Sequence, residues 1–282
     1  MFRKLLFFLL LACIGGSLGA QSLWSDQNEA SISLVGDRRI VPMKYRTVQL
    51  DVSAAESLLG SAPERFKTVS AENQVLITLP NPDGGWQTFQ LFESPVMAPE
   101  LQAQYPEIRC YTGIGVDDPT ATLKCDLTPW GFHAMVISRN HSTVFIDPYS
   151  QGDTQNYVVY YKKDYARKSA NFTCGVDDGE MSTMSENILP NVDPEYQGDC
   201  QLRQYRLALA CTGEYATFHG GTKPLVLAAM NTSMNRVNGV YETDLAITMQ
   251  IIANNDLIIY LNSATDPYTN NNASSLLTEN QN

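Results

Sequence analysis

Residues 75–92 read VLITLPNPDGGWQTFQLF: an apolar run, a turn rich in proline and glycine, and a second run that alternates in polarity. In the second run, Phe89 and Leu91 share one face, whereas Thr88 and Gln90 point to the other. Alternation with a period of two is typical of a half-buried strand, and a turn between two such runs predicts a β-hairpin.

Further short strands are expected on the C-terminal side of this hairpin, spaced by roughly ten residues. The expected strands are 108–112, 120–127, 131–138, 143–146 and 157–161. This spacing predicts that residues 21–165 form a β-rich region, either an antiparallel sandwich or an open barrel. Cys110 and Cys125 fall on neighbouring expected strands, at a spacing that a disulfide could bridge, and two separately buried thiols are the alternative.

The pattern changes after this region. Residues 166–200 lose apolar periodicity and are rich in Ser, Asn, Asp and Pro, which indicates a linker. From residue 201, strands are expected at 205–210, 245–252 and 257–261, with a helix that begins at Lys223 and Pro224. Glycines 213, 220 and 221 indicate a loop, Asn238 and Gly239 are expected near the helix end, and 270–282 form a polar tail.

The expected helix carries Met230, Met234, Val237 and Tyr241 at helical spacing, so this face is interpreted as core. The order strand, helix, strand, strand is the beginning of an α/β or α+β domain. A unit of roughly 80 residues with one helix is small for such a sheet, which suggests the first part of a larger domain.

Composition and charge limit the classes of function. The chain has 282 residues, 44% of them apolar, and a net charge of −11, so a folded core is expected and nucleic-acid binding is not. Residues 1–20 have a basic start, an apolar run and small residues, the pattern of a secretory signal peptide. We therefore expect a secreted, extracellular protein without a transmembrane segment; a lipoprotein signal at Cys13 is the alternative.

Cysteine and aspartate supply the candidate metal ligands. If Cys13 leaves with the signal, five cysteines remain: Cys110, Cys125, Cys174, Cys200 and Cys211. An odd number leaves at least one thiol over, and Cys174, in the expected linker, could occupy the open coordination position of a zinc ion. A disulfide from Cys174 to Cys200 or Cys211 is the alternative. Calcium binding by Asp117, Asp118, Asp147, Asp177 or Asp178 is also considered, although the spacing of an EF-hand loop is absent.

Several segments together resemble secreted bacterial reprolysin-like metalloproteases of the metzincin clan. The resemblance to their catalytic domain covers 205–210, 212–215, 218–221, 234–242, 245–252 and 254–260, and that to their pro-region covers 94–97, 131–135 and 146–149. Residues 174–176, Cys-Gly-Val, are similar to the cysteine switch with which metzincin pro-segments hold the zinc, and Asp178 matches its acidic position.

The resemblance implies a precursor with a signal peptide (1–20), a β-rich pro-region (21–165), a linker with the candidate switch Cys174 (166–200) and the start of an α/β peptidase domain (201–282). It also implies a zinc cofactor and protein or peptide substrates. The extended H-E-x-x-H zinc motif is absent, because His133, His141 and His219 are the only histidines. No catalytic residue is therefore expected in this chain, which is interpreted as truncated and inactive by itself. An extracellular binding module and a free-standing inhibitory pro-region are the alternatives.

Overall fold

A computed structural model describes residues 23–67, 73–166 and 201–281. The expected signal peptide, and Cys174 and Cys200 with most of the expected linker, lie outside the described residues. We refer to residues 23–166 as the sheet region and to residues 201–281 as the C-terminal region.

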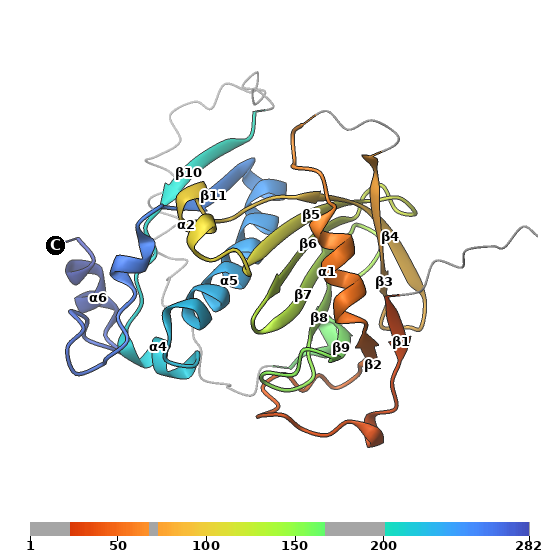
Figure 1. The fold of residues 1–282 in the computed structure, drawn as a ribbon, viewed down its shortest axis with the longest axis horizontal. Coiled ribbons are helices and arrows are strands. Elements are labelled where there is room, and N and C mark those ends of the chain that lie inside the picture. Colours follow the sequence, from red (N-terminus) through yellow and green to blue (C-terminus); the bar gives the residue numbers. More distant parts are fainter. Residues whose placement is uncertain (1–22, 68–72, 167–200, 282) are drawn as a thin grey trace, which may run out of the picture.

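The sheet region is built on nine strands that form one antiparallel sheet in the order β1-β2-β9-β8-β7-β6-β5-β4-β3 (Figure 1). The strands are β1 (Trp24–Asp26), β2 (Arg46–Leu50), β3 (Val75–Pro80), β4 (Trp86–Glu93), β5 (Arg109–Gly115), β6 (Thr122–Thr128), β7 (Gly131–Ile137), β8 (Val144–Pro148) and β9 (Asn156–Tyr161). The predicted hairpin is confirmed as β3–β4, with Pro80 opposite Trp86, and the five expected strands after it correspond to β5–β9.

The two ends of this sheet come close to each other. Arg46 on β2 donates hydrogen bonds to the carbonyl oxygens of Asn81 and Gly85 in the β3–β4 turn, at 3.2 and 3.0 Å. Its guanidinium also lies 4.7 Å from the centroid of the Trp86 ring. Twist accumulates from strand to strand, and over nine strands it curls the sheet until it is nearly barrel-shaped. The expected two-sheet sandwich is therefore not formed.

The concave face of the sheet encloses the first hydrophobic core. Trp24 packs edge-on against Phe132 and Tyr157, with ring centroids 5.4 Å apart in both pairs. Helix α1 (Val52–Gly60) adds Ala55 and Leu59 to this core. The sequence analysis missed α1, as well as the short elements η1 (Glu29–Ser31), α2 (Pro99–Gln104) and η3 (Lys162–Asp164).

The C-terminal region begins with a parallel strand pair. Strand β10 (Arg203–Leu207) pairs with β11 (Ile247–Ile251), and helix α5 (Lys223–Leu245) connects them. The expected helix is thus confirmed at its start, with Pro224 in the first turn, but it does not end near Asn238 and Gly239. It continues to Leu245, because Gly239 lies in the contact with the sheet region and is not a terminator.

Two further expectations for the C-terminal region are wrong, and a third segment contains a helix that was not expected. The expected glycine loop contains helix α4 (Gly213–Phe218), whose N-terminus is capped by the Thr212 side chain. The expected third strand is replaced by the 3-10 turn η4 (Asn255–Ile258) and one bridge between Cys211 and Ile259. The expected polar tail contains α6 (Ala273–Glu279), whose cap is the Asn272 side chain. In α4 and α6, a side-chain oxygen accepts a hydrogen bond from a backbone amide at the start of the helix. Local composition alone does not reveal this stabilisation of the helix start.

A second hydrophobic core is shared by the two regions. Val96, Met97, Leu101, Ile108 and Cys110 of the sheet region pack with α4, α5 and β11. Residues 96–98 also join the edge of β11: the amide of Ala98 donates to the carbonyl of Ile251, and the amide of Ile251 donates to Val96, both at 2.8 Å. The β10–β11 pair is thus extended by a segment that is about 150 residues away in sequence.

Candidate functional site: the contact between helix α5 and the sheet

Helix α5 lies between the convex face of the large sheet and the β10–β11 pair (Figure 1). Its Met230 and Met234 belong to the second core, as the sequence pattern predicts, whereas Tyr241 of the same predicted stripe is exposed. The opposite side of the helix is polar and faces strands β5–β8. We call this contact the helix–sheet interface; its residues are Cys110, Lys124, Asp126, His133, Met135, Asp147, Asn231, Thr232, Asn235, Arg236, Gly239 and Glu242.

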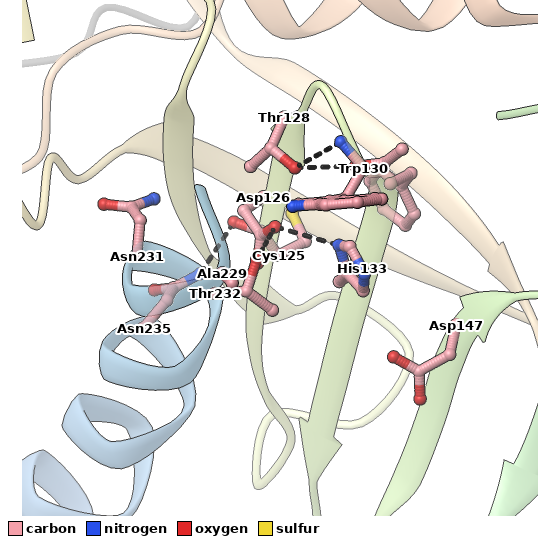
Figure 2. Close-up of polar contacts among 12 residues, drawn as sticks. Cys125, Asp126, Thr128, Trp130, His133, Asp147, Ala229, Asn231, Thr232 and Asn235 are labelled. Atoms are coloured by element: carbon pink, nitrogen blue, oxygen red, sulfur yellow. Dashed lines mark hydrogen bonds and ion pairs between the residues drawn. The ribbon is translucent and has the colours of Figure 1, made fainter. Parts of the chain in front are cut away.

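Asp126 on β6 is the central acceptor of the interface. Its side chain lies between His133 of the sheet and Thr232 of the helix (Figure 2). The Oδ1 atom accepts a hydrogen bond from the Thr232 hydroxyl at 2.7 Å and lies 3.1 Å from Nδ1 of His133. Nearby, the amide of Asn235 donates to the carbonyl of Cys125 at 2.9 Å. The helix therefore bonds both to a side chain and to the backbone of the same strand.

Asp147 on β8 forms the first charged contact across the interface. Nη2 of Arg236 donates to one of its oxygens at 2.5 Å, and the Tyr160 hydroxyl donates to the other at 2.9 Å. Burial by itself would raise the pKa of Asp147, but the charges of Arg236 and His133 and the two hydrogen bonds together outweigh burial and hold the pKa below its usual value. Burial and the neighbouring Asp147 raise the pKa of Tyr160, so this hydroxyl remains a donor.

Lys124, Glu242 and Arg65 form the second charged contact. Nζ of Lys124 donates to Glu242 at 2.8 Å, and Nη1 of Arg65 donates to the same carboxylate at 3.0 Å. The Lys124 side chain is only 2% exposed. Burial lowers the pKa of Lys124 despite Glu242, whereas the two cations outweigh burial at Glu242 and lower its pKa. The helix approaches the sheet closely at Gly239: a Cβ atom there would lie 2.7 Å from Cε of Met135, so the Met135 side chain would have to shift.

Polar groups thus predominate on both faces of this contact, and their charges are matched across it. Matched charged pairs favour one specific arrangement of two surfaces. If the two faces separate, water can hydrate their polar groups. Separating two wholly apolar faces would cost more free energy, because apolar surface would be exposed to water. The polar part of the contact thus has the chemical character of a specific contact that can be hydrated, and it lies beside the second hydrophobic core that the two regions share.

The structure corrects the predicted disulfide. Cys110, Cys125 and Cys211 are free and buried. Cys110 lies opposite Asp126 and Cys125 lies opposite Tyr111, so the two thiols point to opposite faces of the sheet. Cys125 belongs to the first core and Cys110 to the second. The alternative of two separately buried thiols is the one observed. The predicted roles of Cys174 and Cys200 remain predictions.

Histidines and aspartates do not assemble into a metal centre in the part of the chain that the structure describes. His133 is hydrogen-bonded in the interface, His141 contacts the carbonyl of Ser142, and His219 caps the C-terminus of α4. Asp118 accepts bonds from Thr120 and Ser138, and Asp147 is paired with Arg236. The described residues therefore fit neither a zinc nor a calcium centre.

Sequence reasoning identified Asp147 only as a calcium candidate and missed Lys124, Asp126, Arg236 and Glu242. One signal could have indicated them. Asn231, Asn235, Gly239 and Glu242 recur at spacings of three and four and define a second, polar face on α5. No such signal exists for Lys124 and Asp126, because polar residues on one face of a strand usually face water.

Comparison with known proteins identifies the C-terminal region as metallopeptidase-like. Residues 202–282 match the family model described as Metallo-peptidase family M12B Reprolysin-like, which supports a metalloprotease-related region at these positions. A comparison with curated proteins found no match.

The described helices are short or polar compared with membrane-spanning helices. None of them combines the length and the apolar character that crossing a bilayer requires.

Proposed function

We propose that the chain belongs to a secreted zinc metalloendopeptidase precursor in which the sheet region acts as a pro-region. In this proposal, residues 1–20 are a signal peptide, residues 201–282 belong to the peptidase domain, and protein or peptide substrates are cleaved only after the sheet region is removed. The match of residues 202–282 to a metallo-peptidase family supports the peptidase assignment.

The observation that carries the proposal is the helix–sheet interface. Helix α5 lies within the matched segment, and the sheet region contacts it through the buried pairs Asp147–Arg236 and Lys124–Glu242. A pro-region must bind its peptidase specifically and later dissociate. Matched charges between surfaces that can be hydrated satisfy both requirements.

The proposal includes zinc because of the match to a metallo-peptidase family, and not because of any site among the described residues. These residues hold no group of three or more metal-ligating side chains. We therefore assign no catalytic step to them. In this proposal, the role of the sheet region is to bind the peptidase-like region and to order its helix α5.

The test is a peptidase assay on the natural gene product, with a specific protease site introduced between residues 180 and 181. We expect low activity before the cut, higher activity after the cut and removal of the sheet region, and loss of activity with a zinc chelator. If the product shows no peptidase activity in any of these states, the proposal is wrong. A binding module or an inhibitory pro-region would then account for the chain.

The role of the interface is tested separately with Asp147→Asn, which changes only the sheet region. This substitution removes the carboxylate that pairs with Arg236, so the sheet region should bind less tightly. The peptidase activity of the uncut protein should then increase about tenfold. Lys124→Met serves as a second variant. The control is Glu56→Gln, at an exposed position of α1 outside the interface. Equal activity of all four proteins would contradict latency through this interface.

A further inference from the structure

A cavity of about 400 Å³ lies beside the helix–sheet interface and is lined from both regions. The sheet region contributes Arg39, Trp130 and His133 to its wall, and the C-terminal region contributes Phe218, His219 and Arg236. The volume is sufficient for a small organic molecule. Because its wall comes from two regions, the cavity exists only while they are in contact.

Two guanidinium groups line the cavity. Arg39 uses Nη2 to donate to the carbonyl of Phe218 at 3.1 Å, and its guanidinium lies 3.8 Å from the Phe218 ring centroid. A guanidinium has five N–H donors, so most of those on Arg39 can serve a ligand. Arg236 binds Asp147 through Nη2, but its Nε is buried and has no hydrogen-bond partner among the described residues.

The carboxylate in the cavity wall does not balance these charges. Asp147 already accepts bonds from Arg236 and Tyr160. His133 contacts Asp126, which is outside the wall. Burial, and secondarily the charge of Arg39, lower the pKa of His219. The wall therefore holds two guanidinium groups and one carboxylate; because Asp147 compensates Arg236, the charge of Arg39 has no carboxylate partner in the wall.

The rest of the wall is partly apolar. The indole of Trp130 donates through Nε1 to the carbonyl of Leu225 at 2.8 Å, which fixes its orientation, and Ile40 and Phe218 add apolar surface. A guanidinium can bind both oxygens of a carboxylate, and the aromatic surface beside it can pack against an apolar group attached to that carboxylate.

We propose that this cavity binds a small carboxylate with one apolar side group, the chemistry of the C-terminal residue of a short peptide. Such a ligand contacts both regions at once and stabilises their contact by mass action, because it binds the assembled state only. The inference goes beyond the proposed function, since it requires neither peptidase activity nor zinc.

The test is isothermal titration calorimetry of the intact chain with N-acetyl-phenylalanine as the probe. N-acetyl-phenylalaninamide, which has the same ring but no charge, is the matched control ligand. We expect the acid to bind and the amide to bind at least about tenfold more weakly, because a charge-assisted hydrogen bond is lost. Absence of acid binding, or equal affinities, would overturn the proposal.

The location of the site is tested by Arg39→Gln, at an exposed residue whose loss should not prevent folding. We expect it to weaken binding of the acid about tenfold. Arg139→Gln, which changes an exposed arginine outside the cavity, should bind as the unchanged protein does.

A second readout is the pKa of His219, followed by NMR. It should rise when the acid is bound, because the ligand brings a negative charge near the imidazole. Unchanged affinity in Arg39→Gln together with an unchanged His219 pKa would place the ligand elsewhere and refute the site.

Discussion

Individual charged side chains contribute to the stability of this protein chiefly where they are buried. Lys124 and Glu242 are 2% and 10% exposed, whereas Lys44 and Asp83, which also form an ion pair, are 68% and 58% exposed. An exposed pair contributes little, because water solvates both charges nearly as well when the pair is broken. Breaking a buried pair leaves one charge without compensation, so its removal is costly.

Glu242→Gln is therefore expected to lower the free energy of unfolding by about 3 kcal/mol. The substitution leaves buried Lys124 without an anionic partner. Urea denaturation followed by circular dichroism measures the effect. Glu100→Gln, at an exposed position of α2, is the control and should change stability by less than about 0.5 kcal/mol. Equal effects of the two substitutions would show that the pair is not needed for stability.

The buried thiols are expected to be chemically inert. Burial raises the pKa of Cys110 and of Cys125 well above the usual value, so little of the reactive thiolate forms at pH 8. Iodoacetamide should leave both unmodified in the native protein and label both after denaturation, as read by peptide mass spectrometry. Recovery of a disulfide-linked peptide that contains both residues would contradict the register of β5 and β6.

At the scale of elements, short strand-like runs separated by turns predicted β3–β9 well. Phe89 and Leu91 are fully buried, as their shared face indicated. Elements without a periodic apolar pattern were missed: β1 has three residues, and β2 has five. The full length of α5 was also missed, since a glycine that serves a close contact cannot be told from a glycine that ends a helix.

Gly239→Ala tests this close contact. The new methyl group would lie 2.7 Å from Cε of Met135 and 2.9 Å from Cγ of Lys124, so both side chains must shift and the buried Lys124–Glu242 pair is disturbed. Gly60→Ala is the matched control, because a Cβ there has no atom within 4 Å. We expect Gly239→Ala to be less stable than Gly60→Ala by about 1–3 kcal/mol in thermal denaturation. Equal stabilities would mean that α5 does not pack this closely.

At the scale of the whole molecule, two regions that are separate in sequence share one core. Met97, from the sheet region, is fully buried among side chains of the C-terminal region. Its neighbours at 96 and 98 are hydrogen-bonded to β11. The contact between the regions thus combines an apolar part with the polar helix–sheet interface.

Acid is expected to weaken this contact. The pKa values of Asp147 and Glu242 are lowered in the folded protein, so their stabilisation is complete above their ordinary values and is lost as the pH falls below about 4. After a specific cut between residues 180 and 181, in the presence of a reductant, the two fragments should elute together at pH 7 and separately at pH 3 in gel filtration. Asp147→Asn combined with Glu242→Gln should reduce this difference. Co-elution of the unsubstituted fragments at pH 3 would contradict the prediction.

The sequence by itself determined the strand periodicity, the start of α5 and the peptidase-like character of the segment from residue 202. These are local properties, because apolar residues that recur every two or every 3.6 positions can be recognised within a short segment. Only the tertiary structure decided which faces meet. Strand register places Cys110 and Cys125 on opposite faces, and the packing of α5 on the convex side of the sheet pairs Asp147 with Arg236 and Lys124 with Glu242. Pairs of this kind join residues about 90 to 120 positions apart. The packing of the elements decides which residues pair, and no pattern of neighbouring residues in a single sequence indicates it.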